Sequence, residues 1–213
     1  MKVVLDAGHG GYDNGASGNN LKEKDLTLKI VKLIKEGLSH YQVEVYLTRE
    51  KDEYISLPNR STYANVINAD LLVSVHINAG GGSGYETFIH PTVKNDKRMK
   101  ELQACFHNQT ILRDRGRKVN NFSILRLTNM PAILTENGFI DNENDMKIVT
   151  ENINRIAWNH IEAIVKFLKL KKKTNRKVYY IESGGFNNKA DAEKMLLPFK
   201  EKGYYAIIKE RVE

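Results

Sequence analysis

Short apolar segments alternate with longer amphipathic stretches along most of this chain. Residues 2–7, 71–77 and 132–135 are dominated by valine, isoleucine, leucine and other small or apolar residues, so each is predicted to form a buried strand. Apolar residues recur at helical spacing at 21–38 and again at 151–168. Parallel strands need a long crossover connection, which is usually a helix. The alternation therefore predicts an α/β fold with a mostly parallel sheet flanked by helices on both faces.

Further segments continue this order. Val43, Val45 and Leu47 alternate with other residues and predict a strand, and Pro58 stands near the start of a short predicted helix. The remaining predicted elements are strands at 42–47, 85–90 and 123–127 and helices at 57–68 and 96–112. Residues 1–168 are thus expected to form one domain, a common size for a single core.

The composition changes at the end of this domain. Residues 169–177 contain six lysines and arginines and no acidic residue, which indicates a basic linker. Residues 178–213 predict a small βαβ unit, with strands at 178–181 and 204–209 and a helix at 189–201. A unit of this size is too small to bury a sufficient core by itself.

The net charge of +7 does not indicate a nucleic-acid partner, because the linker carries all but one of these charges. The linker is expected either to help hold the chain on a polyanion or to act as a solvated connector. No apolar run approaches the roughly 20 residues that span a bilayer, so no membrane insertion is expected. Residues 1–6 reach an acid too early for a signal peptide, which predicts synthesis in the cytoplasm. The single cysteine, Cys105, excludes an internal disulfide and is expected to be a small buried residue.

Candidate catalytic groups stand where the predicted buried strands end. His9 follows the first strand, His76 closes the second of the three apolar segments, and Glu136 follows the third. Glu23 heads the first amphipathic helix. Because the carboxyl ends of parallel strands meet at one edge of a sheet, we expect these four side chains to converge.

Two histidines and two glutamates are the side chains of a zinc hydrolase. Catalytic zinc commonly has three protein ligands and an open position, and His9, Glu23 and His76 fit the ligand roles. The ion would keep net positive charge, which lowers the pKa of a bound water and polarises a substrate carbonyl. Glu136 fits the general base that accepts the proton of the water and passes it to the leaving amine.

Each of these residues also has a structural alternative. The glycines around His9 suit a phosphate loop, although the lysine of such a motif is absent. Glu23 lies three residues after Asn20, and by spacing alone a capping box is favoured. His76 fits a core histidine as well as a ligand. Glu136 is the hardest to explain structurally, because a carboxylate that ends a buried strand needs a partner.

The other histidines fit structural positions. His40 suits a helix C-terminus, His90 and His107 are expected at the surface, and His160 is expected to be a structural polar residue. The sequence contains no His-Glu-x-x-His, no paired cysteines and no Gly-x-Ser-x-Gly. These absences exclude the metal and serine-hydrolase motifs that those patterns define.

A set of short motifs occurs in a fixed order through residues 1–168. They are Leu5-Asp6-Ala7-Gly8-His9-Gly10-Gly11, Asp13, Gly15-Ala16, Glu23-Lys24, Leu47-Thr48-Arg49, Leu57, Arg60, Ala64-Asn65, Ala69-Asp70, Ser74-Val75-His76-Ile77-Asn78 and Met130-Pro131-Ala132-Ile133-Leu134-Thr135-Glu136-Asn137-Gly138-Phe139. This order resembles the zinc-dependent N-acetylmuramoyl-L-alanine amidases, and among them most of all autolysins and phage endolysins.

The resemblance implies an α/β fold, a zinc cofactor and cleavage of the amide between N-acetylmuramic acid and L-alanine in peptidoglycan. It assigns metal ligation to His9, Glu23 and His76 and catalysis to Glu136. For Glu23, it overrides the capping interpretation that spacing favours. Asn78, two residues after a ligand, is expected to face the substrate cleft.

A second resemblance concerns the C-terminal unit. Gly184-Gly185-Phe186, Ala190, Ala192-Glu193 and Gly203 resemble part of the SPOR-type sporulation repeat, which binds peptidoglycan glycan strands. Glu182 stands where the repeat commonly has glutamine, and one of its two βαβ halves is absent. Because a half-domain leaves a sheet edge unpaired, two copies are expected to pair as a homodimer. The enzyme is expected to reach the cell wall after a holin opens the membrane or a mother cell lyses.

Two other functions share parts of the pattern. A zinc peptidase acting on the stem peptide would use the same metal chemistry, and a digest separates the two because only an amidase frees the amino group of alanine from muramic acid. A non-catalytic wall-binding module needs no base, so Glu136 argues against it. Nucleic-acid binding is disfavoured further, because the positive charge is confined to the linker.

Overall fold

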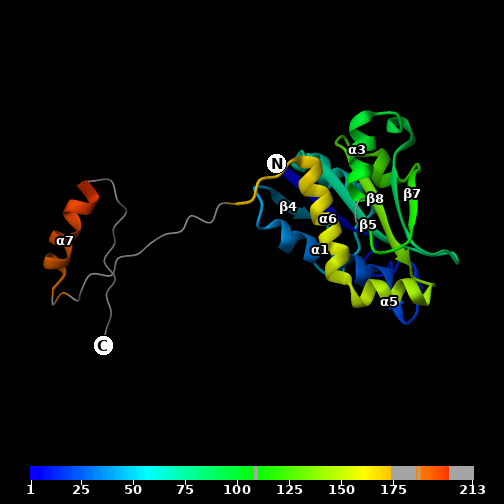
Figure 1. Cartoon of the computed structure of the whole chain (residues 1–213), viewed down its shortest axis with the longest axis horizontal. Coiled ribbons are helices and arrows are strands. Elements are labelled where there is room, and N and C mark those ends of the chain that lie inside the picture. Colours follow the sequence, from blue (N-terminus) through cyan, green and yellow to red (C-terminus); the bar gives the residue numbers. More distant parts are fainter. Residues whose placement is uncertain (108–109, 174–185, 187, 202–213) are drawn as a thin grey trace. The chain divides into compact units, whose positions relative to one another are not determined.

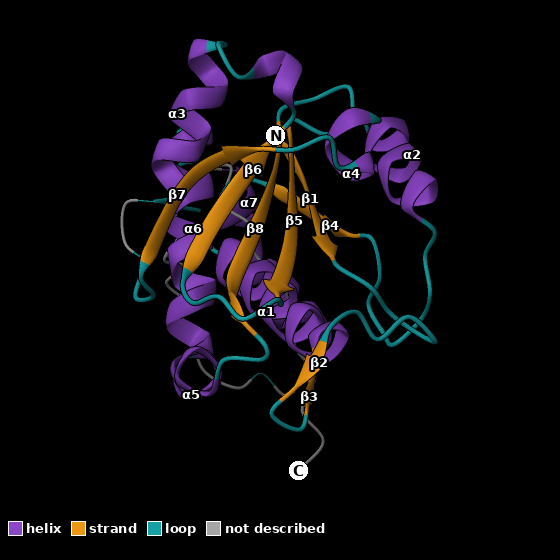
Figure 2. Ribbon diagram, turned by 90° about the vertical axis from the view of Figure 1, so that its right-hand side faces the viewer, coloured by secondary structure: helices purple, strands orange, loops and turns teal. Residues whose placement is uncertain are grey.

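The computed structural model describes residues 1–107, 110–173, 186 and 188–201, and the chain divides into two compact units, Met1–Lys173 and Thr174–Glu213. The first unit is built on a sheet with strand order β4-β1-β5-β8-β6-β7 (Figure 2). The strands are β1 (Lys2–Ala7), β4 (Glu44–Leu47), β5 (Leu71–Asn78), β6 (Tyr85–Ile89), β7 (Asp114–Val119) and β8 (Ala132–Phe139). Strands β4, β1, β5 and β8 are parallel, whereas β6 runs antiparallel to β8 and parallel to β7. The predicted mostly parallel sheet is confirmed.

Helices cover both faces of this sheet, as predicted (Figures 1 and 2). One face carries α1 (Glu23–Leu38), α3 (Lys97–Phe106), α5 (Glu143–Glu151) and α6 (Ile153–Leu168). The other face carries α2 (Leu57–Ile67) and the short α4 (Ser123–Arg126). A small hairpin of β2 (Ser17–Gly18) and β3 (Leu21–Lys22) precedes α1, and a 3₁₀ turn, η1 (Pro91–Val93), follows β6.

The central strands are apolar on both faces because both faces are covered. Along β1, Val3 and Leu5 belong to the core that includes α1 and α6, whereas Val4 belongs to the core that includes α2 and α4. All three side chains are fully buried. Successive side chains of a strand point to opposite faces, so a strand between two helical layers lacks polar alternation.

The structure corrects the predicted elements between α3 and β8. Residues 123–127 were expected as a strand, but Ser123–Arg126 form α4, in which the adjacent Ile124 and Leu125 are both buried. A short apolar run does not distinguish a strand from a buried helical turn. The helix expected at 96–112 ends at Phe106, and the chain then forms β7, whose sequence is mostly charged. Such a composition suits an edge strand, which β7 is.

Two histidines outside the candidate site are buried, and one of them was predicted to be at the surface. His107 was expected at the surface, but only 4% of its side chain is exposed. Its Nε2 lies 2.9 Å from the hydroxyl of Thr87, and its Nδ1 lies 2.8 Å from a carboxylate oxygen of Asp114. His160 is buried as a structural polar residue, and Cys105 is buried as predicted. Burial of His107 follows from the return of the chain to form β7.

The first residues of the predicted basic linker lie against the first unit. Helix α6 ends at Leu168, and its C-cap residue Lys169 has a left-handed conformation with φ 51°. The amide of Gln42 donates to the carbonyl of Lys171 (2.9 Å), and the amide of Lys173 donates to the carbonyl of His40 (2.8 Å). Residues 169–173 are therefore paired with the segment that follows α1.

Of the second unit, the structure describes chiefly α7 (Lys189–Glu201), which matches the predicted helix and contains Pro198. The predicted strands at 178–181 and 204–209, the linker residues 174–177, and Glu182, Gly184, Gly185 and Gly203 lie outside the described residues. Among the described helices, none has the length and apolar character needed to cross a membrane.

We predict that His160 makes stability depend on pH. Its Nδ1 lies 2.9 Å from the carbonyl of Ile156 and its Nε2 3.0 Å from the hydroxyl of Thr135, and burial lowers its pKa to about 4. The unfolded chain binds this proton near pH 6.5, so stability is lost as the pH falls from 6.5 towards 4. Between pH 7.5 and 5 this group removes ~2 kcal/mol from the free energy of unfolding.

Urea denaturation of the wild type and of His160→Gln at both pH values tests this prediction. The substitution lowers stability at pH 7.5 but flattens its pH dependence by the amount given above. Parallel pH profiles for the two proteins would show that another group carries the effect.

Candidate metal centre and active site

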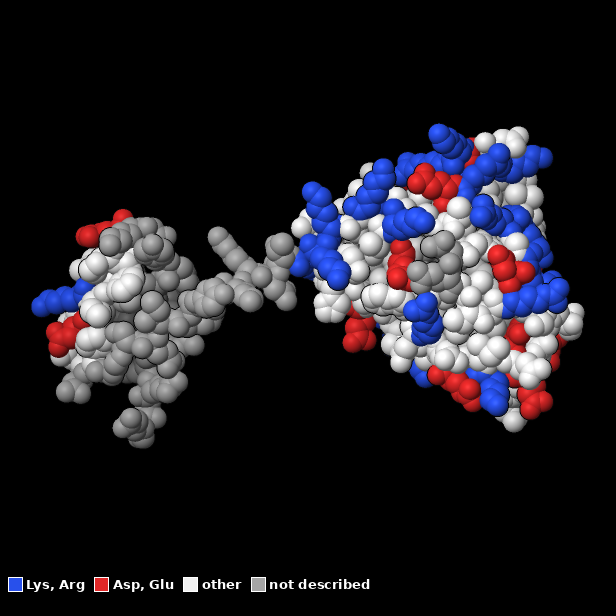
Figure 3. Space-filling model, viewed as in Figure 1, with Lys and Arg blue, Asp and Glu red and all other residues white. Residues whose placement is uncertain are grey.

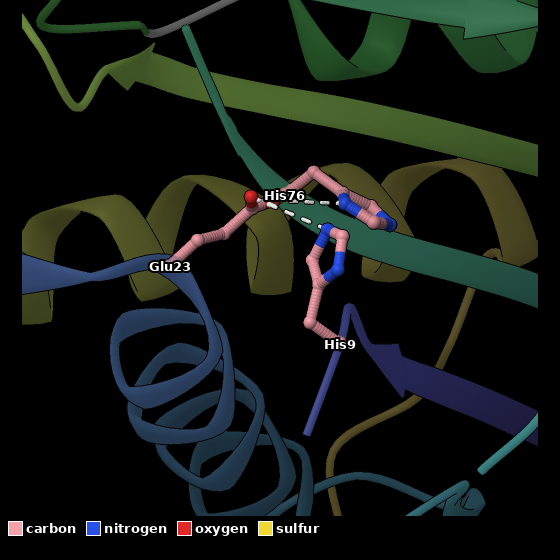
Figure 4. Close-up of side chains that lie close together, drawn as sticks. All are labelled: His9, Glu23 and His76. Carbon is pink, nitrogen blue, oxygen red and sulfur yellow. Dashed lines mark hydrogen bonds and ion pairs between the residues drawn. The ribbon is translucent and has the colours of Figure 1, made fainter. Parts of the chain in front are cut away.

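Four side chains predicted from the sequence converge at the carboxyl edge of the parallel strands. His9 lies just beyond β1, His76 lies within β5, and Glu23 is the first residue of α1 (Figure 4). Glu136 lies on β8, directly opposite His76 in the β5–β8 register. The strand order brings β1, β5 and β8 side by side, which is why residues distant in sequence meet here.

The Glu23 carboxylate lies between the two histidines, as Figure 4 shows. Its Oε1 is 2.9 Å from Nδ1 of His76, and its Oε2 is 3.2 Å from Nε2 of His9. The same oxygens accept hydrogen bonds from the amides of Ile77 (3.1 Å) and Ala16 (2.9 Å). One candidate ligand atom from each of the three side chains lies within 4.8 Å of the other two.

The capping-box alternative for Glu23 is wrong. Helix α1 begins with Lys22 at the N-cap position, and no side chain there makes a capping hydrogen bond. The carboxylate of Glu23 instead contacts His9 and His76. Glu23 is only 4% exposed, and in this orientation its carboxylate is surrounded by hydrogen-bond donors that compensate its charge.

Asp13 orients the imidazole of His9. Its Oδ2 lies 2.9 Å from Nδ1 of His9, while its Oδ1 accepts a hydrogen bond from the amide of Gly15 (3.0 Å). A proton on Nδ1 leaves the Nε2 lone pair directed towards Glu23, which is the arrangement found around metal-bound histidines. This orienting role of Asp13 was not predicted from the sequence. The position of an aspartate four residues after a candidate histidine ligand is the feature that could have indicated it.

Two glycines leave room for the ligand side chains. A Cβ atom at Gly8 would lie 2.4 Å from the His76 ring. A Cβ at Gly15, where φ is +64°, would lie 2.5 Å from Oε2 of Glu23 and 2.6 Å from the His9 ring. His9 itself has φ 61°, which few non-glycine residues adopt. The loop after β1 is therefore shaped around the imidazoles.

Two buried arginines hold the backbone of this loop. Arg60 donates from Nη1 to Asp6 (2.8 Å) and from Nη2 to the carbonyl of His9 (2.7 Å). Arg49 donates from Nη2 to the carbonyl of Gly8 (3.0 Å) and from Nε to that of Ala7 (3.1 Å). The Asp6 carboxylate, which also accepts from nearby hydroxyl groups, balances the charge of Arg60.

The histidine–glutamate contacts control protonation at the centre. Burial opposes ionisation of Glu23, but hydrogen bonds from His76 and His9 outweigh it and hold the pKa of Glu23 far below its ordinary value. Burial likewise opposes protonation of His9, but Glu23 and Asp13 raise its pKa to about 9. Burial also opposes protonation of His76, but its hydrogen bond to Glu23 and the nearby carboxylates outweigh burial and raise its pKa. A metal ion would therefore displace protons from both imidazoles when it binds.

Glu136 differs from the other carboxylates at this edge. Its Oε2 is buried and has no hydrogen-bond partner among the described residues. Burial is the largest influence on its pKa, which rises to about 7. A buried carboxylate oxygen without a partner is rare in native structures and is a common feature of functional sites.

A third carboxylate, Glu86, faces Glu136 across the β6–β8 pair. Its oxygens accept from Nε of Arg115 (2.6 Å), from Nζ of Lys118 and from the side-chain amide of Asn78 (2.9 Å). Glu86 was not predicted as part of this site, because β7, the strand that carries Arg115 and Lys118, was not predicted. Asn78, expected to face the cleft, directs its amide nitrogen to Glu86, and its oxygen accepts from the amide of Ala79.

The fold is that of bacterial cell-wall hydrolases. The N-acetylmuramoyl-L-alanine amidase of Clostridium difficile 630 aligns with a TM-score of 0.73 and 34% identity, over 79% of this chain and 96% of that one. Residues 3–166 match the family model described as N-acetylmuramoyl-L-alanine amidase, and the chain belongs to this family. It is therefore an enzyme that hydrolyses the amide bond between N-acetylmuramic acid and L-alanine in peptidoglycan.

The sequence of this chain is also similar to those of two curated relatives. The sporulation-specific N-acetylmuramoyl-L-alanine amidase of Bacillus subtilis (strain 168) is 38% identical over 98% of this chain and 84% of its own length. The endolysin of Bacillus phage SPP1 is 44% identical over 81% of this chain and 68% of its own length. Both are similar to this chain well beyond the candidate site.

We predict that Gly15→Ala removes metal binding while the fold persists. The added Cβ would overlap Glu23 and the His9 ring, so the three ligands cannot keep their present positions. Gly81→Ala is the matched control, since Gly81 has a comparable φ of +74° and no atom within 4 Å of the added Cβ. Metal content per chain, measured by plasma mass spectrometry, should fall at least tenfold for Gly15→Ala and stay constant for the control. Equal metal content in both variants would show that the loop tolerates a side chain at residue 15.

Proposed function

We propose that His9, Glu23 and His76 bind a zinc ion and that Glu136 is the general base of the amidase reaction. Two imidazoles and one carboxylate with their ligand atoms within 4.8 Å of one another form a donor set typical of catalytic zinc. Zinc, when bound, lowers the pKa of a coordinated water and polarises a carbonyl group. Asp13 would hold His9 in the tautomer that ligates through Nε2.

The observation that carries the assignment of Glu136 is its unpartnered Oε2 beside the ligand set. In the proposed reaction this oxygen accepts a proton from the water that attacks the lactyl carbonyl carbon. The carbon–nitrogen bond then breaks, and the same carboxyl group gives the proton to the departing amine of alanine. A pKa of about 7 suits a group that both accepts and donates a proton near neutrality.

Asn78 remains a proposed contributor to the substrate cleft. It lies two residues after His76, and its amide contacts Glu86, which is paired with Glu136 across the strands. It would act by shaping the wall of the cleft next to the base. The proposed setting is breakdown of the bacterial cell wall, in which the relatives named above take part as a sporulation amidase and an endolysin.

We predict that Glu136→Gln abolishes hydrolysis without loss of zinc. The amide keeps the size of the side chain but accepts no proton from water, and general-base loss typically costs 10²–10⁴-fold in rate. Glu162→Gln is the matched control, because Glu162 on α6 also has a buried Oε2 with no partner in the described part of the chain. New alanine amino groups released from purified peptidoglycan measure activity, and plasma mass spectrometry measures zinc.

Three outcomes of this experiment contradict parts of the proposal. Full activity of Glu136→Gln would remove Glu136 as the base. Zinc loss in that variant would make Glu136 a ligand rather than a base. If zinc-free His9→Ala protein released alanine amino groups at the wild-type rate, the reaction would need no metal at His9.

We also propose that residues 178–213 form a wall-binding unit that pairs with a second copy, joined by residues 169–177 to the catalytic domain at 1–168. Helix α7 supports this, because the apolar side chains of Met195, Leu197 and Phe199 are 42–54% exposed in the described part of the chain. Light scattering of the full chain should give twice the mass of one copy. Both truncation after Lys173 and Leu197→Glu in the full chain should give monomers. A monomeric wild type, or dimers in both variants, would contradict pairing through this unit.

A further inference from the structure

Two tyrosines stack on the surface beside the metal-centre loop. The rings of Tyr12 and Tyr54 have centroids 4.3 Å apart and an interplanar angle of 25°. Tyr12 is 79% exposed and Tyr54 41% exposed, so the pair keeps most of its ring area in water. Tyrosine has a large apolar ring with a polar tip, and an exposed cluster of such rings indicates a surface that binds something.

Tyr12 lies in the same tight turn that carries the candidate ligand His9. The amide of Gly10 donates to the carbonyl of Asp13 (2.8 Å), and the amide of Asp13 donates back to Gly10 (3.1 Å). Tyr12 is therefore at the tip of a two-residue turn whose closing residue, Asp13, holds the His9 ring. Tyr12 thus lies on the loop that carries His9, three residues further along the chain.

The loop that carries Tyr54 is fastened to this turn. Buried Lys24 donates to the carbonyl of Gly11 and to a carboxylate oxygen of Asp52, both at 2.8 Å. The other oxygen of Asp52 accepts from the amide of Gly11 (2.7 Å). A Cβ at Gly11 would lie 2.7 Å from the amide nitrogen of Tyr54, so the two backbones are in close contact. The two rings are thus held in place before any ligand arrives, which reduces the entropy lost on binding.

The position of the pair indicates which part of the substrate it meets. Tyr12 follows β1 and Tyr54 follows β4, the edge strand next to β1. Glu136 and Glu86 lie on β8 and β6, beyond β5 on the opposite side of His9. The scissile amide joins a sugar to a peptide, so the two halves of the substrate leave the centre in different directions. Arg115 and Lys118 of β7 pair with Glu86, but Arg117 on the same strand is exposed, and lysines and arginines gather over β7 (Figure 3). This side suits the stem peptide, which carries carboxylates, and this leaves the β4 side for the glycan.

We propose that Tyr12 and Tyr54 form a platform on which a sugar ring of the glycan strand stacks during amide hydrolysis. A pyranose ring presents apolar C–H groups on its faces and hydroxyl and acetamido groups at its edge. The exposed face of a tyrosine ring matches these C–H groups, so the ring rather than the hydroxyl is the expected contact. The inference rests on the proposed function, because it takes the substrate to be peptidoglycan bound at the His9–Glu23–His76 centre.

Binding of a peptide-free tetrasaccharide of alternating N-acetylglucosamine and N-acetylmuramic acid tests the platform. It is measured by calorimetry on the full-length Glu136→Gln protein, and the Kd of the site in the catalytic domain is fitted separately from that of the proposed wall-binding unit, which is the same in every variant compared. Adding Tyr12→Ala should raise Kd about tenfold, the size expected for losing one ring-stacking contact. Tyr12→Phe keeps the ring and should bind as the parent does. Trp158→Ala, which removes an exposed aromatic residue on α6, should also leave Kd unchanged.

Kinetics on peptidoglycan separate a sugar contact from damage to the centre. With Glu136 intact, Tyr12→Ala should raise KM about tenfold and leave kcat and the zinc content at wild-type values. An unchanged Kd for the tetrasaccharide, or an equal effect of Trp158→Ala, would overturn the platform. A drop in kcat together with zinc loss would show that Tyr12 acts only by supporting the His9 loop. If the wild type released no alanine amino groups, the proposed function would fail, whereas the tetrasaccharide measurement would still decide the platform.

Discussion

The buried ion pair between Asp6 and Arg60 is the constraint on which the active-site edge depends. Both side chains are almost completely excluded from water, so neither charge can stay there without the other. Arg60 uses its remaining donors on backbone carbonyls, including that of His9, and Arg49 does the same for the two residues before it. These carbonyls belong to the last residue of β1 and to the loop that follows it. The arginines thus supply hydrogen-bond donors to these carbonyls and hold His9 at a positive φ.

This arrangement contributes more to geometry than to stability. Desolvating a carboxylate and a guanidinium costs several kcal/mol for each ion, and their attraction offsets that cost only when every donor is satisfied. A hydrophobic pair in the same space would leave the carbonyls of residues 7–9 without partners, and the loop would relax. The clearance at Gly8 and Gly15 would then have no function, because the imidazoles it accommodates would no longer be held in place. The buried charges, the glycines and the left-handed conformation of His9 therefore act together to position the imidazoles.

How much of this could be predicted from the sequence depends on how local the signal is. Strands β1, β5 and β8 were predicted because their apolar runs are continuous. His9, His76 and Glu136 were selected as candidates because each stands at or near the carboxyl end of one of these strands. Glu23 was assigned to the candidate ligands through the family resemblance, since its spacing from Asn20 favoured a cap that does not form. Strand β7 was missed because an edge strand needs one neighbour and tolerates charge. Glu86 and its cations were missed with it, because their role exists only once β6, β7 and β8 lie side by side.

The three glutamates at this edge, Glu23, Glu86 and Glu136, have different surroundings, and these surroundings give them different roles. Glu23 is kept ionised by two histidines, and Glu86 by Arg115, Lys118 and hydrogen bonding. For Glu136, burial outweighs the charges of His76 and His9, and the neighbouring Glu23 and Glu86 raise its pKa further, whereas the pKa values of those two glutamates fall. If Arg115 and Lys118 were absent, Glu86 would compete with Glu136 for the same proton, and the two would titrate as a coupled pair. By keeping Glu86 ionised, the cations of β7 leave Glu136 as the one of these three glutamates that can exchange a proton near neutral pH. Environments that push the pKa values of neighbouring acids apart are how active sites divide ligand and base between chemically identical side chains.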